Sequence, residues 1–228
     1  MSGFLPISRA DMEERGWEEA DFVFVSGDAY VDHPSFGPAI LTRLLEAHGY
    51  RVGIIAQPDW RMASDFRRLG RPRLAFLVSA GNLDSMLSSR TAAKKRRGSD
   101  AYSPGGRTGC RPDRATIVYA HRIREAYPGV PVIIGGIEAS LRRLAHYDYW
   151  SDSVRRSILV DSMADILIYG MGERALLEIA ADLHRGVDVQ CIQDVKGTCY
   201  RVPDFDYAYG YERLPSFAEV RGDRRAFA

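Results

Sequence analysis

The 228-residue sequence lacks long apolar runs, a disulfide framework and a dominant charge. No stretch of about 18 apolar residues occurs, so no segment has the length of a membrane-spanning helix. The first 21 residues carry six acidic side chains, which excludes a secretory signal peptide. With 31 basic and 30 acidic residues, nothing in the overall charge favours a nucleic-acid or membrane partner. We therefore expect a cytoplasmic protein with no membrane partner.

Cysteine is scarce, and motifs of common catalytic sites are missing. Cys110, Cys191 and Cys199 form no C-x-x-C pair, which excludes a disulfide scaffold and favours a reducing compartment. A zinc site or cluster would require the fold to bring these distant thiols together. The sequence has no G-x-S-x-G, H-E-x-x-H or P-loop motif. We predict no catalytic residue and no metal ligand set.

Short apolar segments alternate with helical patterns along most of the chain. The strand segments are apolar throughout, which is typical of a parallel sheet buried on both faces. This order predicts an α/β fold, Rossmann-like or flavodoxin-like, with a mostly parallel sheet and helices on both faces. The expected strands are 22–25, 52–56, 74–78, 131–134 and 165–169, and the expected helices begin near 37, 114, 138 and 173.

The chain divides into three expected parts. Residues 1–20 form an N-terminal extension, 21–187 the Rossmann-like domain, and 188–228 a β-hairpin followed by a linker. The hairpin is expected from Cys191–Val195 and Cys199–Val202, which flank Lys196-Gly197.

Ligands of open α/β sheets bind beyond the carboxyl ends of the strands. Four segments are expected there: 26–37, 79–112, 135–140 and 170–173. In the first glycine turn, Gly135, Gly136 and Ser140 are candidate cofactor contacts, because glycine lets backbone approach a ligand closely. A tight turn without a ligand explains the same residues equally well.

The second glycine turn, Gly170-Met171-Gly172-Glu173-Arg174-Ala175, fits G-x-G-x-x-G/A after a strand. Gly170, Gly172 and Glu173 are therefore candidate cofactor contacts. A dinucleotide site is disfavoured, because Glu173 places a negative charge near the expected pyrophosphate and no further β-α-β unit follows. A turn whose acidic residue complements the helix dipole is the simpler interpretation.

The loop from Asp28 to Gly37 holds two carboxylates and an imidazole. Asp28, Asp32 and His33 could bind a metal, with His33 the candidate ligand to a cobalt ion, or could cap the loop. The D-x-H-x-x-G spacing of cobalamin domains that replace the lower axial base is not met.

A basic loop runs from Lys94 to Arg114. Its candidate substrate contacts are Lys94, Lys95, Arg96, Arg97 and Arg107, which could grip phosphate or RNA. A solvated charged loop is the alternative.

The aromatic run His146–Trp150 could stack on a planar ligand or pack against the sheet or a neighbouring domain. Arg142, Arg143, Arg155 and Arg156 are candidate partners for Asp148 and Asp152.

Together these segments resemble the N-terminal region of the YgiQ family of radical SAM proteins. The resemblance extends over about Asp11 to Ala228 and is carried by the runs GDAYVDHPSFGPAILTRLLEAHGYRVGIIAQPDW, DSMLSSRTAAKKRRGSDAYSPGGRTGCRPDRA, IIGGIEASLRRLAHYDYWSDSVRRSIL and DILIYGMGERALLEIA. It implies a cobalamin-binding-like domain preceding a radical SAM core. It also implies a [4Fe–4S] cluster and S-adenosylmethionine in the parent protein, with cobalamin as a further candidate cofactor.

The family's C-x-x-x-C-x-x-C cluster motif is missing from this sequence. We therefore expect a fragment or truncated product, inactive alone, whose partner is the missing core in cis. The leading hypothesis is an accessory domain of a radical SAM enzyme of unknown substrate. The alternatives are a phosphate- or RNA-binding module using the loop 94–114, and a nucleotide-dependent enzyme using Gly170–Ala175.

Overall fold

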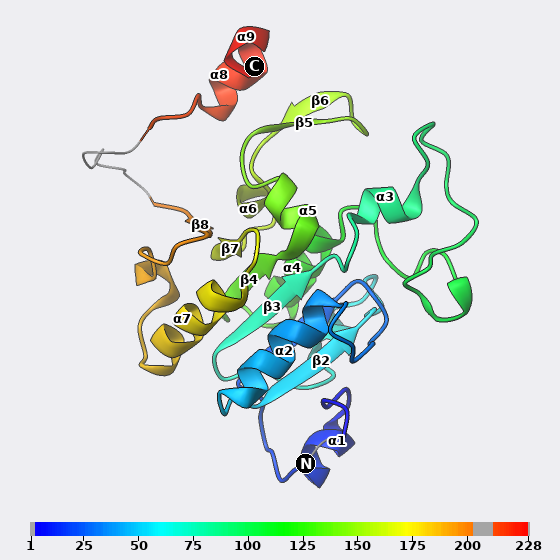
Figure 1. Cartoon of the computed structure of the whole chain (residues 1–228), viewed down its shortest axis with the longest axis vertical. Helices are drawn as coiled ribbons and strands as arrows, with labels where there is room; N and C mark the ends of the chain where they lie inside the picture. The colour runs from blue at the N-terminus through cyan, green and yellow to red at the C-terminus, as the bar shows by residue number, and fades with distance from the viewer. Residues whose placement is uncertain (1–2, 203–211, 228) are drawn as a thin grey trace.

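The computed structural model describes residues 3–202 and 212–227 and has a six-stranded sheet at its centre (Figure 1). The strand order is β2-β1-β3-β4-β7-β8, in which only β8 runs antiparallel to its neighbour. The predicted α/β class and mostly parallel sheet are confirmed. The strands of this sheet are β1 (Phe22–Ser26), β2 (Val52–Ala56), β3 (Ala75–Ser79), β4 (Val132–Gly135), β7 (Ile166–Ile168) and β8 (Thr198–Tyr200).

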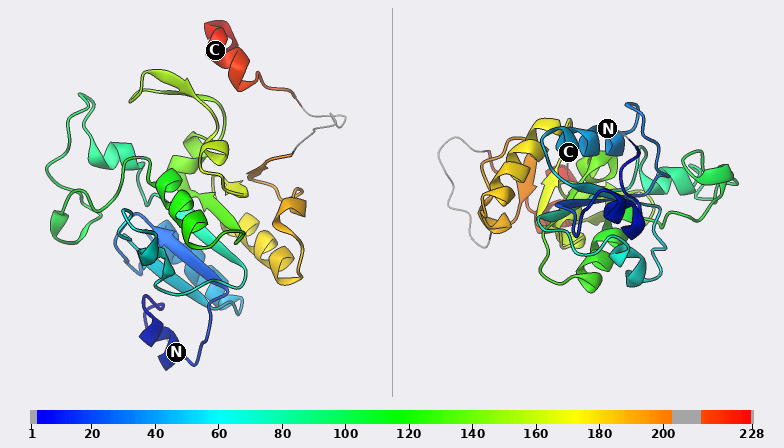
Figure 2. Two further views of the ribbon diagram at one scale, coloured as in Figure 1. Left: turned by 180° about the vertical axis from the view of Figure 1, so that it is seen from behind. Right: turned by 90° about the horizontal axis from the view of Figure 1, so that it is seen from below.

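Helices cover both faces of the sheet, as the two views in Figure 2 show. Side chains alternate along each strand. Phe22 and Phe24 of β1 therefore face α2 (Gly37–Ala47) and α7 (Glu173–His184), whereas Val23 and Val25 face α4 (Ala115–Ala126). The other helical segments are α1 (Arg9–Glu14), η1 (Ala63–Arg67), α3 (Ser85–Ser89), η2 (Pro104–Gly106), α5 (Gly136–Leu141), α6 (Ile158–Asp161), η3 (Val189–Cys191), α8 (Phe217–Gly222) and α9 (Arg224–Phe227).

The N-terminal segment, predicted to be an extension, packs against the sheet. Leu5 joins the hydrophobic cluster on the α2 side, and Met12 joins the cluster on the α4 side. The Pro6 carbonyl accepts a hydrogen bond from the Ile54 amide at 2.8 Å. None of the helices in the described residues is long and apolar enough to span a bilayer.

The predicted hairpin at 191–202 is wrong. Cys191 ends the short helix η3, and Thr198–Tyr200 forms β8, which pairs with β7. Without β8, β7 would be an edge strand with unpaired backbone groups. Gly197, with a φ of 84°, reverses the chain so that β8 runs back along β7.

A β-hairpin forms at 146–155 and includes His146, directly after the helix expected over 138–145. The helix expected over 138–145 is α5 and stops at Leu141. The Arg142 carbonyl accepts a hydrogen bond from the Ile158 amide, and the chain between them leaves the domain as β5 (His146–Asp148) and β6 (Ser153–Arg155). The C-terminal helix α8 contacts β6.

A buried arginine fixes the long segment between β3 and α4. The Arg111 side chain is only 3% exposed, and its Nη1 lies 2.9 Å from Asp28 Oδ1. Its Nη2 lies 3.0 Å from Asp100 Oδ2, and its Nη1 donates to the Ala80 carbonyl at 2.7 Å. Burial raises the pKa of Asp28 even with the guanidinium beside it. Arg111 therefore ties both ends of the segment to the carboxyl ends of β1 and β3.

We expect Arg111→Met to lower the free energy of unfolding by about 3–5 kcal/mol, because it leaves two carboxylates buried without their counter-charge. Urea denaturation of the two proteins measures this difference. Adding Asp28→Asn and Asp100→Asn should recover part of the loss. Arg71→Met, at an exposed arginine, is the control and should change stability little. A loss below about 1 kcal/mol for Arg111→Met would contradict the assigned role.

Candidate functional site

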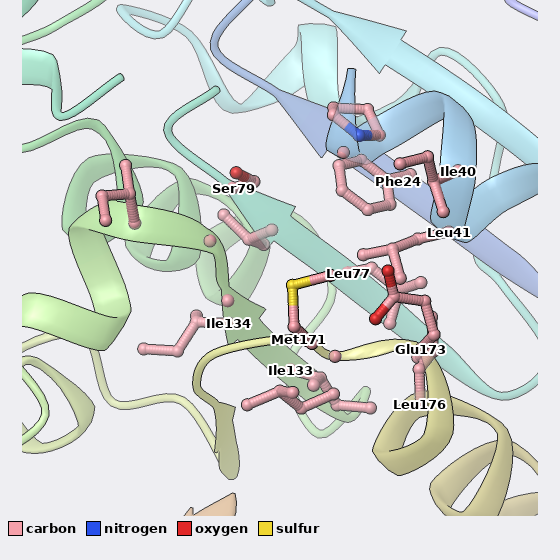
Figure 3. A pocket seen from close by; sticks show the side chains of 18 of the residues that line it. Phe24, Ile40, Leu41, Leu77, Ser79, Ile133, Ile134, Met171, Glu173 and Leu176 are labelled. Atoms are coloured by element: carbon pink, nitrogen blue, oxygen red, sulfur yellow. The ribbon is translucent and has the colours of Figure 1, made fainter. Parts of the chain in front are cut away.

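An apolar pocket of about 260 Å³ lies between α2 and α7, at the carboxyl ends of β1, β3, β4 and β7. In Figure 3, Ile40 and Leu41 of α2 lie on one side of it, and Glu173 and Leu176 of α7 lie on the other. Parts of all four segments predicted for this edge of the sheet line it. The lining residues are Phe24, Gly37, Pro38, Ile40, Leu41, Leu77, Val78, Ser79, Gly81, Asn82, Ile133, Ile134, Gly135, Gly136, Ile137, Ile168, Gly170, Met171, Gly172, Glu173 and Leu176.

The two glycine turns are joined through Ser140. Its Oγ donates to the Gly136 carbonyl at 2.8 Å and accepts from the Gly170 amide at 3.2 Å. Gly136 has a φ of 80°, and a Cβ placed there would lie 2.6 Å from Ser79 Oγ. Only glycine therefore gives this turn its shape and keeps that part of the pocket open.

At the mouth of the pocket, the positive N-terminal end of α7 lies beside the negative Glu173 carboxylate. Gly172 precedes α7 and provides no side-chain cap, so the first amides of this helix lack a capping partner from that residue. The Glu173 carboxylate stands in the same turn and offsets the positive end of the helix dipole. Met171, which is 85% exposed, adds an apolar side chain at the rim. The mouth therefore favours a neutral group over a phosphate.

Helix α5, whose first residues line the pocket, is anchored by a buried carboxylate, Glu138, that was not predicted from the sequence. Glu138 is 1% exposed, and its two oxygens accept from the Ser85 amide at 2.8 Å and the Thr116 amide at 3.0 Å. Arg142, just after α5, forms an ion pair with Asp84. The position of a glutamate in the first turn of a helix does not show whether it is buried, so only the structure reveals this role.

The carboxylates and imidazole of the 28–37 loop are not brought together. Asp28 faces Arg111, and Asp32 pairs with Arg43. His33 is exposed and outside the pocket, and its Nδ1 accepts from the Ser35 amide at 3.1 Å. Within residues 3–202 and 212–227, no group of three or more His, Cys, Asp or Glu side chains could hold a metal ion.

The basic loop lies outside the pocket, and its arginines nearest α4, Arg111 and Arg114, are paired with carboxylates. Lys94, Lys95, Arg96, Arg97 and Arg107 are exposed, and none forms an ion pair with another described residue. The loop instead touches the aromatic hairpin, where Lys94 Nζ lies 4.7 Å from the centroid of the Tyr149 ring.

The arginines flanking the hairpin do not pair as expected with Asp148 and Asp152. Asp148 pairs with Arg114 at 2.6 Å, and Arg155 and Arg156 both pair with Asp161. Arg143 lies over the Tyr169 ring.

Comparison with known proteins identifies the family. The sequence profile of the radical SAM N-terminal family matches residues 4–228. The chain belongs to this family. It is 58% identical over 226 residues to a UPF0313 protein of Clostridium perfringens, and 54% identical over 225 residues to one of Clostridium botulinum. These alignments include 99% of this chain but only 34% and 35% of the relatives, so the chain spans about one third of their length.

The fold is similar to part of a larger solved enzyme. The radical S-adenosylmethionine methyltransferase TsrM from Kitasatospora setae, solved with cobalamin and a [4Fe–4S] cluster, matches 81% of this chain with a TM-score of 0.52. The match includes 29% of TsrM at 19% sequence identity. A second TsrM structure, with tryptophan substrate and a SAM analogue, matches 80% of the chain with a TM-score of 0.51 at 18% identity. The resemblance to radical SAM proteins predicted from the sequence is confirmed, and the TsrM likeness supports the fold.

We expect Gly136→Ala to destabilise the protein by about 1–3 kcal/mol more than Gly129→Ala, as measured by urea denaturation. Both glycines have a φ of 80°, but a Cβ at Gly129 would meet nothing within 4 Å. The backbone strain is thus matched, and the difference isolates the contact with Ser79. Equal losses of stability in the two variants would show that the turn can shift away from Ser79.

Proposed function

We propose that this chain is the N-terminal accessory domain of a radical SAM enzyme and that its pocket holds the aromatic base of a cobalamin-type cofactor. The observation that carries the proposal is the position of the apolar pocket, between α2 and α7 at the carboxyl edge of the parallel sheet. The cobalamin in the similar TsrM structure supports the choice of cofactor.

The size of the pocket fits one part of such a cofactor. Pockets that enclose a whole drug-sized ligand measure about 300–1,000 Å³, and this one measures about 260 Å³. A planar aromatic base matches the apolar walls that Phe24, Leu77 and Ile133 provide, whereas the larger corrin ring would have to remain outside.

The charge at the mouth also selects the base over a phosphate. Glu173 would repel a pyrophosphate placed at the start of α7, so the electrostatics oppose the dinucleotide alternative. Its carboxylate can instead accept a hydrogen bond from a polar group of the bound cofactor.

The domain would hold the cofactor without supplying a ligand from His33, which is exposed and outside the pocket. Cobalamin, once bound, would supply a cobalt ion for group transfer. The residues that line the pocket would bind the aromatic base, exclude water from it and fix its position at the carboxyl edge of the sheet. In the full-length protein, the remaining two thirds would bind the cluster and S-adenosylmethionine.

We expect this chain to bind hydroxocobalamin saturably, with a change in its visible spectrum. Leu41→Trp should weaken binding about tenfold or more, because the indole fills space on the α2 side. Leu44→Trp is the matched control, since Leu44 is also half-buried on α2 but does not line the pocket. Absence of saturable binding, or equal effects of the two variants, would contradict a cofactor in this pocket.

The radical SAM assignment has a separate test. We expect the full-length Clostridium perfringens relative, purified without oxygen, to contain iron and sulfide bound as a [4Fe–4S] cluster. This chain, treated identically, should contain none, because no ligand set occurs in its described residues. A full-length relative that binds no iron after reconstitution would contradict the parent activity.

A further inference from the structure

Two exposed features that are distant in the sequence meet on one surface. The tip of the β5–β6 hairpin points toward the loop that follows α3 (Figure 1). Tyr149 Oη donates to the Ala92 carbonyl at 2.6 Å, and Lys94 Nζ donates to the Trp150 carbonyl at 3.4 Å. We call this the basic-aromatic surface, defined by Lys94–Arg97 and Tyr147–Trp150.

Of the carboxylates near this surface, Asp152 accepts a hydrogen bond from the Tyr147 hydroxyl, and two others are paired with arginines. Asp113 pairs with Arg90 at 2.5 Å, and Asp148 pairs with Arg114 at 2.6 Å. Lys95 and Arg96 are exposed and form no ion pair with any described residue. Their charges are therefore available to an anionic partner.

Large rings lie beside these charges and face solvent. Tyr147 and Tyr149 are each 49% exposed, and the Trp150 ring packs edge-on against Tyr149 with centroids 5.3 Å apart. Aromatic side chains next to cations suit a partner that alternates planar rings with phosphates. An acidic polypeptide would use the charges but not the rings.

We propose that the basic-aromatic surface binds a single-stranded stretch of RNA. Single strands present unstacked bases to aromatic side chains and phosphates to lysine and arginine. RNA is the chosen partner because its loops expose such bases, whereas cellular DNA is mostly duplex. The surface lies outside the apolar pocket, so the proposal does not depend on a bound cofactor.

The charge component is tested by fluorescence anisotropy with an unstructured RNA of about 16 nucleotides. Arg96→Ala should weaken binding and reduce the slope of log affinity against log salt concentration by about 0.7. Arg71→Ala is the matched control, since Arg71 is also exposed and precedes β3 at the opposite edge of the sheet. Equal effects of both variants would overturn the assignment to this surface.

The stacking component is tested at Tyr147, whose hydroxyl donates a hydrogen bond to the Asp152 side chain. Tyr147→Ala should weaken RNA binding about fivefold or more, whereas Tyr147→Phe, which keeps the ring, should bind within about twofold of the unmodified chain. Unchanged binding by Tyr147→Ala would overturn the proposal. So would equal affinity for polyglutamate, which would indicate an acidic protein partner, or tighter binding of an RNA duplex.

Discussion

The buried Arg111 guanidinium is the contact on which the carboxyl edge of the sheet depends. It neutralises Asp28 after β1 and Asp100 in the long segment after β3, and it bonds the Ala80 carbonyl between them. Burying a charged group has a high desolvation cost. One arginine offsets this cost for two carboxylates only when both carboxylates lie within hydrogen-bonding distance of its guanidinium group. The segment from Ser79 to Arg114 is therefore held in place despite having only two short helical turns of its own.

The pocket and the basic-aromatic surface share one support. The α5 helix begins at the glycine turn that lines the pocket, and its Glu138 carboxylate bonds the first turns of α3 and α4. Arg142, just after α5, pairs with Asp84 at the start of α3. The loop bearing Lys94–Arg97 follows α3 and leads to α4. A displacement of α5 at the pocket would therefore move α3 and α4, the two helices that flank this loop. A packed helix transmits displacement in this way because the interior around it has little free volume.

The sequence predicted the elements that depend on local pattern. Each strand of the parallel sheet appears within about one residue of its expected position, and the glycine turns at 135–136 and 170–172 both reach the pocket. Predictions failed where distant contacts decide. Thr198–Tyr200 pairs with β7 rather than with its sequence neighbours. The helix begun at Gly136 ends at Leu141, and the next carbonyl, of Arg142, accepts a hydrogen bond from the distant Ile158 amide. For Asp28, Asp32 and His33 the sequence left metal binding and loop capping open, and only the structure shows that the three side chains face different partners.

By itself, the sequence determined the α/β class, the strand positions and the family, because apolar periodicity, glycine turns and long characteristic runs are local properties of the chain. Tertiary structure alone decided that the two glycine turns, α2 and α7 enclose one pocket, that Glu138 is a buried anchor, and that Lys94 meets Tyr149. These results depend on contacts between residues far apart in the sequence. Such contacts depend on the order in which the strands pair and on which charged side chains form ion pairs when they are buried. The spacing of residues within one segment specifies neither the strand order nor the ion pairs.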